Sequence, residues 1–156
     1  MLKVAIGQDS HRFELNPTTK KLILGGVIFE NEPALEGNSD ADVILHAITN
    51  AISGITCVNI LGEASDNMCK NGKTDSKYYI EEALKYLKGN IQHISISIEC
   101  LKPQISPKIE QMRKSIANLL KITNQDVGIT ATSGEGLTDF GKGLGISCFA
   151  CITVEV

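Results

Sequence analysis

The sequence of 156 residues has the length of one ordinary domain, and 15 Lys and Arg residues against 18 Asp and Glu give a formal net charge of −3. Hydrophobic residues make up 42% and charged residues 21%, which excludes a disordered, collagen-like or coiled-coil chain. The slightly acidic balance, without a block of Lys or Arg, argues against electrostatic binding of nucleic acid or an anionic membrane. We therefore expect a single domain over residues 1–156.

The first half of the sequence contains two strand patterns and one helix pattern. Residues 3–8 and 21–29 are typical of strands, and a Gly-Gly pair inside the second indicates a bend. A Ser-x-x-Asp sequence from Ser39 resembles a capping box, and apolar residues at helical spacing follow it. We expect a helix over about 40–53 and an irregular segment over 54–74.

The second half of the sequence continues the alternation of predicted strands and helices. An apolar stripe predicts a second helix between Asp75 and Gly89, and alternating isoleucines predict a strand over 91–98. A Ser-Pro pair, a cap followed by a first-turn proline, predicts a third helix over 106–120. Strands over 127–132 and 146–156 complete the chain.

Strands interleaved with three helices predict an α/β (α+β) fold. We expect a mixed four-stranded sheet with three helices on one face, which is a two-layer sandwich. No apolar run approaches the roughly 18 residues that cross a bilayer, and Met1 leads almost directly into a strand rather than a signal peptide. We therefore expect a cytoplasmic protein.

The five cysteines are Cys57, Cys69, Cys100, Cys148 and Cys151. Cys148 and Cys151 match the C-x-x-C pattern of redox proteins, but three residues along a strand place the two thiols on opposite faces. We expect all five to be buried apolar side chains.

Asp9 and His11 stand at the end of the first strand, where alternate residues point to the same face. A catalytic zinc ion takes three protein ligands and keeps one open position, and His46 on the first helix is a candidate third ligand. The alternative is a hydrogen-bonded pair at a strand end with an ordinary helical histidine. His93, which has isoleucines nearby on both sides, is expected to be an ordinary strand residue.

A second candidate site lies between Thr130 and Lys142. Its hydroxyls, its backbone N–H groups at glycine and its one cation suit the oxygens of a diphosphate, and Glu135 could hold Mg²⁺ against them. The alternative is an ordinary polar loop. The segment lacks the P-loop pattern, so a nucleotide hydrolase of that class is excluded.

Four motifs occur in a fixed order along nearly the whole chain. They are Gly7-x-Asp9-x-His11; Ser39-Asp40-x-Asp42-Val43-x-x-His46-Ala47; Pro103-x-x-x-Pro107; and Ala131-Thr132-Ser133-x-Glu135 with Gly141-Lys142-Gly143-x-Gly145-Ile146. Together they resemble the 2-C-methyl-D-erythritol 2,4-cyclodiphosphate synthase family of the non-mevalonate isoprenoid pathway.

The resemblance implies a homotrimer with each active site shared between neighbouring subunits. It implies a lyase-type reaction in which the 2-phosphate of 4-diphosphocytidyl-2-C-methyl-D-erythritol 2-phosphate attacks the β-phosphate and expels CMP. Asp9, His11 and His46 would bind Zn²⁺ or another divalent transition metal, and Glu135 would bind Mg²⁺ or Mn²⁺. Ser133 would stabilise the transition state, and no nucleic acid or membrane partner is implied.

The resemblance also implies a substrate-binding set, in which the backbone of 100–106 forms a cytidine pocket. Its members are Asp9, Ser10, His11, Asn38, Ser39, Glu63, Ala64, Ser65, Cys100, Leu101, Lys102, Pro103, Gln104, Ile105, Ser106, Thr132, Ser133, Gly134, Glu135 and Lys142.

The sequence departs from the family pattern at several of these positions. Asn38, which the resemblance makes a catalytic residue together with Ser133, stands where the family usually has a histidine. It can bind a phosphate by hydrogen bonds but carries no charge. The family's G-D-I-G segment is replaced by the four residues from Gly62, and Lys142 replaces an arginine. These changes leave open a trimer that binds zinc and a cytidine nucleotide with impaired catalysis, or a structural zinc domain.

Overall fold

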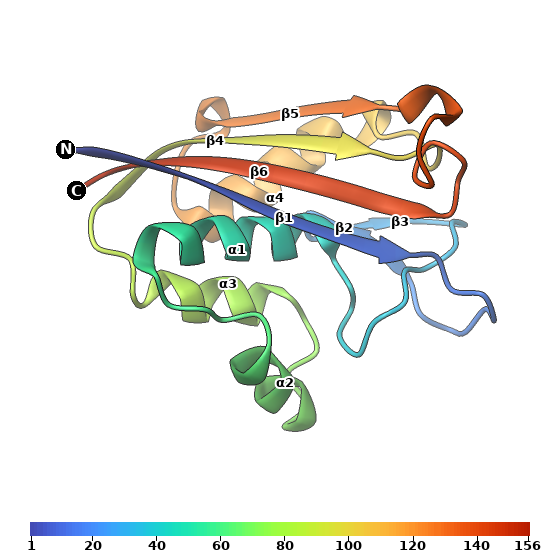
Figure 1. Ribbon diagram of the computed structural model, residues 1–156, viewed down its shortest axis with the longest axis horizontal. Coiled ribbons are helices and arrows are strands. Elements are labelled where there is room, and N and C mark those ends of the chain that lie inside the picture. The colour runs from blue at the N-terminus through green and yellow to red at the C-terminus, as the bar shows by residue number, and fades with distance from the viewer.

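The main sheet of the protein has four strands. The computed structural model describes all residues from Met1 to Val156. The strands lie in the order β1 (Leu2–Arg12), β6 (Gly145–Glu155), β4 (Asn90–Glu99) and β5 (Val127–Thr132) (Figure 1). β4 and β5 are parallel, whereas the other two pairs are antiparallel. The predicted mixed four-stranded sheet is confirmed.

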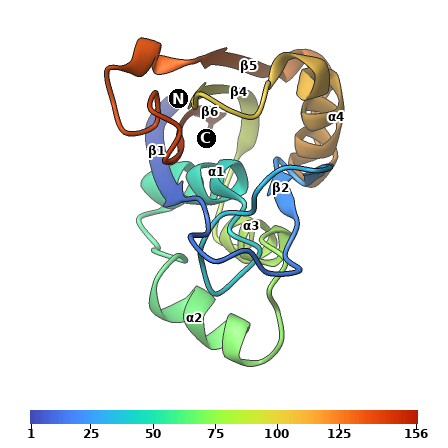
Figure 2. The same cartoon turned by 90° about the vertical axis from the view of Figure 1, so that its right-hand side faces the viewer.

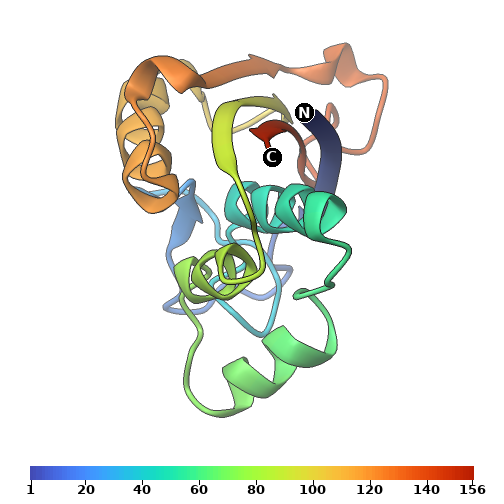
Figure 3. The same cartoon turned by 90° about the vertical axis from the view of Figure 1, so that its left-hand side faces the viewer.

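The three predicted helices lie on one side of this sheet (Figures 1 and 3). They are α1 (Val43–Thr56), α3 (Lys77–Leu84) and α4 (Ile109–Leu120). α1 packs on β1 and β6, α4 packs beside β5, and α3 packs against α1. The core between the layers is mainly isoleucine, leucine, valine and alanine. No helix is long enough and apolar enough to span a membrane.

The predicted strand over 21–29 is instead a hairpin. It consists of β2 (Leu22–Leu24) and β3 (Val27–Phe29), which form a separate two-stranded sheet. Gly25 and Gly26 between them have φ of 61° and 77°, the left-handed conformation that tight hairpin turns require and that glycine adopts without strain. The predicted bend at these glycines is confirmed.

The expectation of an irregular segment over 54–74 is wrong, because this segment contains α2 (Glu63–Lys70). α2 is the element farthest from the sheet, beyond α1 and α3 (Figure 2). It buries only Ser65, so it lacks the apolar stripe by which a helix is recognised in a sequence. The backbone N–H of Gly62 donates to the Ser65 hydroxyl at 3.0 Å and so caps the helix.

The cysteines are all free, and Cys148 and Cys151 lie on opposite faces of β6. Cys100 and Cys148 are buried, but Cys57 is exposed. Cys57 follows the last turn of α1 with a φ of 62°, beyond the part of that helix that packs in the core. The expectation of five buried thiols is therefore confirmed only at Cys100 and Cys148, because Cys69 and Cys151 are partly exposed and Cys57 is exposed.

The start of α1 is fixed by Asp42 rather than by Ser39. The Asp42 carboxylate accepts hydrogen bonds from Leu45 N (3.0 Å), Gly25 N (2.8 Å) and Gly26 N (2.7 Å). It therefore caps the helix and also ties the helix start to the β2–β3 turn. His46 projects from the first turn of the helix held in this way.

Helix α1 approaches β1 closely at Gly7. A Cβ atom on Gly7 would lie 2.1 Å from the carbonyl oxygen of Ala47 and 2.2 Å from the backbone nitrogen of Ala51. Both contacts are with backbone atoms, which cannot turn aside as a flexible side chain can. The missing side chain of Gly7 therefore sets the distance at which α1 packs on β1.

Gly7→Ala is expected to push α1 away from β1. We expect the free energy of unfolding, measured by urea denaturation, to fall by about 1–3 kcal/mol because the interface is overpacked. Gly128→Ala in β5 is the matched control, since its Cβ would meet its nearest atom, His93 Nε2, at 3.6 Å, and it should stay within about 1 kcal/mol of the wild type. Equal stability of the two variants would contradict the close packing at Gly7.

Candidate active site

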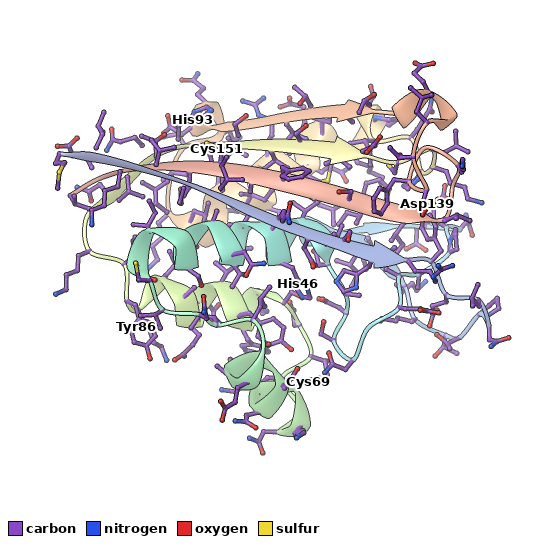
Figure 4. The ribbon with its side chains drawn as sticks, viewed as in Figure 1. His46, Cys69, Tyr86, His93, Asp139 and Cys151 are labelled. Carbon is purple, nitrogen blue, oxygen red and sulfur yellow. The ribbon has the colours of Figure 1, made fainter.

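The structure brings Asp9, His11 and His46 together. Asp9 Oδ2 lies 2.8 Å from His11 Nε2 and 3.1 Å from His46 Nδ1, and the two ring nitrogens are 3.3 Å apart. Potential ligand atoms of all three residues lie within 4.8 Å of one another. His46 reaches this point from α1, below the sheet, as Figure 4 shows. The convergence expected from the sequence is confirmed.

The two histidines determine the charge state of Asp9. Burial alone would raise the pKa of Asp9, but hydrogen bonds and charge interactions with His11 and His46 outweigh it and lower the pKa to about 2. Burial would in turn lower the pKa of His11, but the hydrogen bond and the charge of Asp9 raise it overall. The cluster therefore presents an ionised carboxylate between two imidazoles.

Each imidazole is also held at its second nitrogen. His11 Nδ1 lies 2.8 Å from the carbonyl oxygen of Glu36, and His46 Nε2 lies 2.9 Å from the Ser76 hydroxyl. Metal-binding histidines are usually oriented by such a partner on the nitrogen that does not face the ion. The remaining nitrogens, His11 Nε2 and His46 Nδ1, both face Asp9.

This donor set fits a divalent transition metal ion. Two imidazole nitrogens and one carboxylate oxygen are three ligands of the types that such ions prefer. The side chains remain 10% to 23% exposed, so a further ligand can reach the centre from solvent.

Asn38 and Ser39 lie between this cluster and α2. The Asn38 amide donates to Asp66 Oδ1 at 3.4 Å, and the Cys69 thiol donates to the Asn38 carbonyl at 2.9 Å. Glu63, Ala64 and Ser65 belong to the first turn of α2, so they sit on a helix and not on the irregular segment that the sequence predicts. Ser65 is buried, and its hydroxyl is engaged in the cap.

The second group of candidate residues also comes together, at a different place. Cys100 N donates to Thr132 O at 3.1 Å, and Leu101 N donates to Phe140 O at 3.0 Å. The segment from Cys100 to Ser106 therefore lies beside the Ser133–Lys142 loop. Thr132 and Ser133 lie at the end of β5, at the opposite edge of the sheet from Asp9 and His11 on β1. The loop then returns to β6, and its Asp139 and Phe140 line a pocket with His11. Three strand spacings separate β1 from β5, which is about 14 Å.

Glu135 has a conformation that is unusual for a residue with a side chain. Its φ is 53°, between Gly134 at 78° and Gly136 at 71°, and strain of this kind is typical of functional sites. Its carboxylate is exposed and forms no side-chain hydrogen bond or ion pair. Gly134 has a φ of 78°, and a Cβ there would lie 3.0 Å from the backbone Cα of Gly141, which explains the glycine at this position.

Sequence reasoning missed the residues that hold the histidine rings from behind. Ser76 is completely buried and 30 residues from His46 in the chain. Asp40, which contacts Ser76, belongs to a motif identified in the sequence, but nothing there points to this contact. The Glu36 carbonyl is a backbone group and leaves no signal in a sequence.

His46→Ala should abolish stoichiometric binding of a divalent transition metal ion, because the two remaining ligands hold such an ion weakly. The measurement is equilibrium dialysis against Zn²⁺ or Co²⁺ followed by elemental analysis. His93→Ala is the matched control, because His93 lies on β4, away from the cluster (Figure 4), and it should bind as much metal as the wild type. Full binding by His46→Ala would exclude His46 as a ligand.

Comparisons with known proteins show the family of the chain. The model of the YgbB family matches residues 2–155. A protein of Chlamydia caviae named 2-C-methyl-D-erythritol 2,4-cyclodiphosphate synthase is 53% identical over 97% of this chain and 88% of its own length.

Solved structures share the fold along the whole chain. The crystal structure of a 2C-methyl-D-erythritol 2,4-cyclodiphosphate synthase from Plasmodium vivax has a TM-score of 0.80 and 25% identity, over 99% of this chain and 98% of that one. A Plasmodium falciparum IspF in complex with CDP has a TM-score of 0.81 and 27% identity, over 98% of this chain and 95% of that one. The chain therefore belongs to the YgbB family, the family of the 2-C-methyl-D-erythritol 2,4-cyclodiphosphate synthases.

Proposed function

We propose that this protein converts 4-diphosphocytidyl-2-C-methyl-D-erythritol 2-phosphate to 2-C-methyl-D-erythritol 2,4-cyclodiphosphate and CMP. The observation that carries the proposal is the Asp9, His11 and His46 cluster, with both imidazoles turned toward the carboxylate. The names of the relatives support the reaction, and the CDP complex of the Plasmodium falciparum protein supports a cytidine diphosphate moiety in the substrate. The reaction belongs to non-mevalonate isoprenoid precursor synthesis.

The chemistry needs no nucleophile from the protein. An oxygen of the 2-phosphate attacks the β-phosphorus, and the bond between that phosphorus and the oxygen bridging to the α-phosphate breaks. The bridging oxygen leaves with CMP, and the product is a cyclic diphosphate. Catalysis then consists of holding the attacking and leaving oxygens in line and neutralising the phosphate charges.

Different side chains of the protein would position the phosphates and neutralise their charge. Asp9, His11 and His46 would hold Zn²⁺ or a similar ion, and Glu135 would hold Mg²⁺ or Mn²⁺. When bound, these ions supply positive charge beside the phosphate oxygens. The Ser133 hydroxyl would donate a hydrogen bond to an oxygen of the transferring phosphate, and the Asn38 amide would bind the 2-phosphate.

The cytidine pocket in this proposal is the backbone of the segment from Cys100 to Ser106, beside Thr132 and Gly134. Backbone groups bind a base edge regardless of the side chains, so Gln104 and the other members of the segment can vary without losing the pocket. Lys142, in the loop that folds against this segment, would supply a positive charge near the diphosphate.

We further propose a homotrimer in which two subunits complete each site. The metal cluster and the Ser133–Glu135 group stand at opposite edges of one sheet, so the second group would come from a neighbouring subunit. The side chains of Val4, Ile6 and Phe149 on the outer face of the sheet are 63%, 68% and 48% exposed. Exposed apolar side chains on one face are typical of a surface that another subunit covers.

A second candidate function is a trimer that binds metal and a cytidine nucleotide with little turnover. The observation that favours it is the Asn38 amide, which has no charge and already donates to Asp66 at 3.4 Å. An uncharged group stabilises a phosphate less than an imidazolium does. Measurement of turnover separates the two functions.

Glu135→Gln should keep the transition metal and lose most of the Mg²⁺-dependent turnover. The wild type, given Zn²⁺, Mg²⁺ and the diphosphocytidyl substrate, should release CMP, and the variant should release it at least about 100-fold more slowly because the ligand charge is lost. Glu81→Gln on the exposed side of α3 is the control and should match the wild type. Absence of CMP from the wild type would favour the second function, and full activity of Glu135→Gln would exclude Glu135 as a metal ligand in catalysis.

Asn38→His should preserve or raise turnover. A histidine there can carry a positive charge beside the 2-phosphate, whereas asparagine can only donate hydrogen bonds. The measurement is the rate of CMP release at saturating substrate. A large fall in rate with unchanged metal content would mean that the phosphate is bound elsewhere.

A further inference from the structure

The ring of His46 is held from behind by Ser76, which is in turn held by Asp40, and the proposed reaction uses neither residue. The Ser76 side chain is completely buried, and its hydroxyl oxygen lies 2.9 Å from His46 Nε2. The same hydroxyl donates a hydrogen bond to Asp40 Oδ1. Ser39 Oγ is farther from the ring nitrogen, at 3.5 Å, and already accepts from Ala41 N.

The direction of the bond from Ser76 to Asp40 follows from the other contacts of this carboxylate. Asp40 Oδ2 accepts from Ser76 N at 3.0 Å, and Asp40 Oδ1 accepts from Asp42 N at 3.1 Å. Asp40 is therefore an acceptor at both oxygens. A carboxylate in this role has no hydrogen to give, so the hydroxyl hydrogen of Ser76 points to Asp40.

The position of that one hydrogen determines where the hydrogen of the imidazole is. A serine hydroxyl has a single hydrogen, and when Asp40 receives it, only oxygen lone pairs remain for His46. The contact at 2.9 Å is then a hydrogen bond only if His46 Nε2 carries a hydrogen. In the neutral ring Nδ1 is left with its lone pair, and Nδ1 is the nitrogen 3.1 Å from Asp9 Oδ2.

We propose that Asp40 and Ser76 are positioning residues that keep His46 in the Nε2–H tautomer, so that Nδ1 is free to bind the metal ion. In the metal-free protein the Nδ1–H tautomer of His46 competes with the Nε2–H tautomer. With the hydrogen on Nδ1, the ring would donate to Asp9, and the nitrogen that faces the metal site would be blocked. The Ser76–Asp40 pair favours the other tautomer, and the negative charge of Asp40, acting through the hydroxyl, makes Nδ1 a stronger ligand.

The same contacts fix the orientation of the His46 ring, because they join two segments that are distant in the chain. Asp40 N donates to Thr74 O at 2.9 Å, so the residues before α1 are joined to the start of α3 by both backbone and side chain. His11 has a simpler arrangement, in which one backbone carbonyl, that of Glu36, accepts from Nδ1. The two ligand rings thus use opposite nitrogens, and each is set by its own partner.

The first test observes the tautomer in the wild-type protein without metal. The protein contains only three histidines, so ¹⁵N-histidine labelling gives three sets of ring signals, and His46→Ala and His93→Ala identify them. At a pH where the ring is neutral, two-bond ¹H–¹⁵N correlations should show His46 protonated at Nε2. Protonation at Nδ1 would overturn the proposal, and this outcome does not depend on any Ser76 or Asp40 variant folding.

The second test measures zinc affinity by competition with a chelator. Ser76→Ala should weaken binding about 10- to 100-fold, the usual effect of losing the partner of a ligand histidine, and should increase the Nδ1–H signal of His46. Ser53→Ala is the matched control, because Ser53 is also a buried serine, on the same helix as His46, and its hydroxyl has no hydrogen-bond partner. It should bind zinc like the wild type.

An affinity of Ser76→Ala within twofold of the Ser53→Ala control would overturn the role of Ser76. The inference deepens the proposed metal role of His46, but both tests use zinc alone and no substrate. If Ser76→Ala binds zinc normally and the wild type releases CMP, this inference is wrong and the proposed reaction stands. If the wild type binds zinc but releases no CMP, the proposed reaction is contradicted and this inference is not.

Discussion

The close contact between α1 and β1 at Gly7 is the constraint on which the metal cluster depends. Asp9 and His11 follow Gly7 on the same face of β1, and His46 precedes Ala47, whose carbonyl touches Gly7. A side chain on Gly7 would separate the two elements and move His46 away from the strand. The Asp42 cap acts along the same helix, since it fixes the residue at which α1 begins and therefore the direction of His46. One small residue and one cap thus place three ligands from two distant segments.

The electrostatics of the cluster follow from this packing. Asp9 is largely buried, yet its carboxylate is ionised because two imidazoles contact it. In the proposed function the same atoms hold a divalent ion, which becomes the positive partner of Asp9. The partners behind the rings, the Glu36 carbonyl and the Ser76 hydroxyl, keep one nitrogen of each ring directed at this position.

The remaining parts of the proposed site, Ser133 and Glu135, are brought together with the 100–106 segment at the other edge of the sheet, which is the reason to propose a site shared between subunits.

Much of this arrangement could be predicted from the sequence, and the failures have identifiable physical causes. Strand periodicity placed Asp9 and His11 on one face, and helical periodicity found the helix that carries His46, because burial leaves a repeating apolar pattern. The helix α2 was missed because it is mostly exposed and has no such pattern. The Ser-x-x-Asp box predicted a helix start at the wrong residue, because Asp42 caps α1 with help from the turn at Gly25 and Gly26, which is distant in the chain. The contact of Ser76 with His46 joins residues 30 apart, and a single serine in a sequence does not reveal its partner.

The central claim is that Asp9, His11 and His46 hold one metal ion. The most direct measurement is X-ray diffraction from a crystal of the protein grown with Zn²⁺, with data collected on both sides of the zinc absorption edge. The account predicts one anomalous peak per chain, bonded to an Asp9 carboxylate oxygen, His11 Nε2 and His46 Nδ1, at about 2.0–2.2 Å from each. No peak at this position, or a zinc ion bound to other residues with the two imidazoles apart, would contradict it.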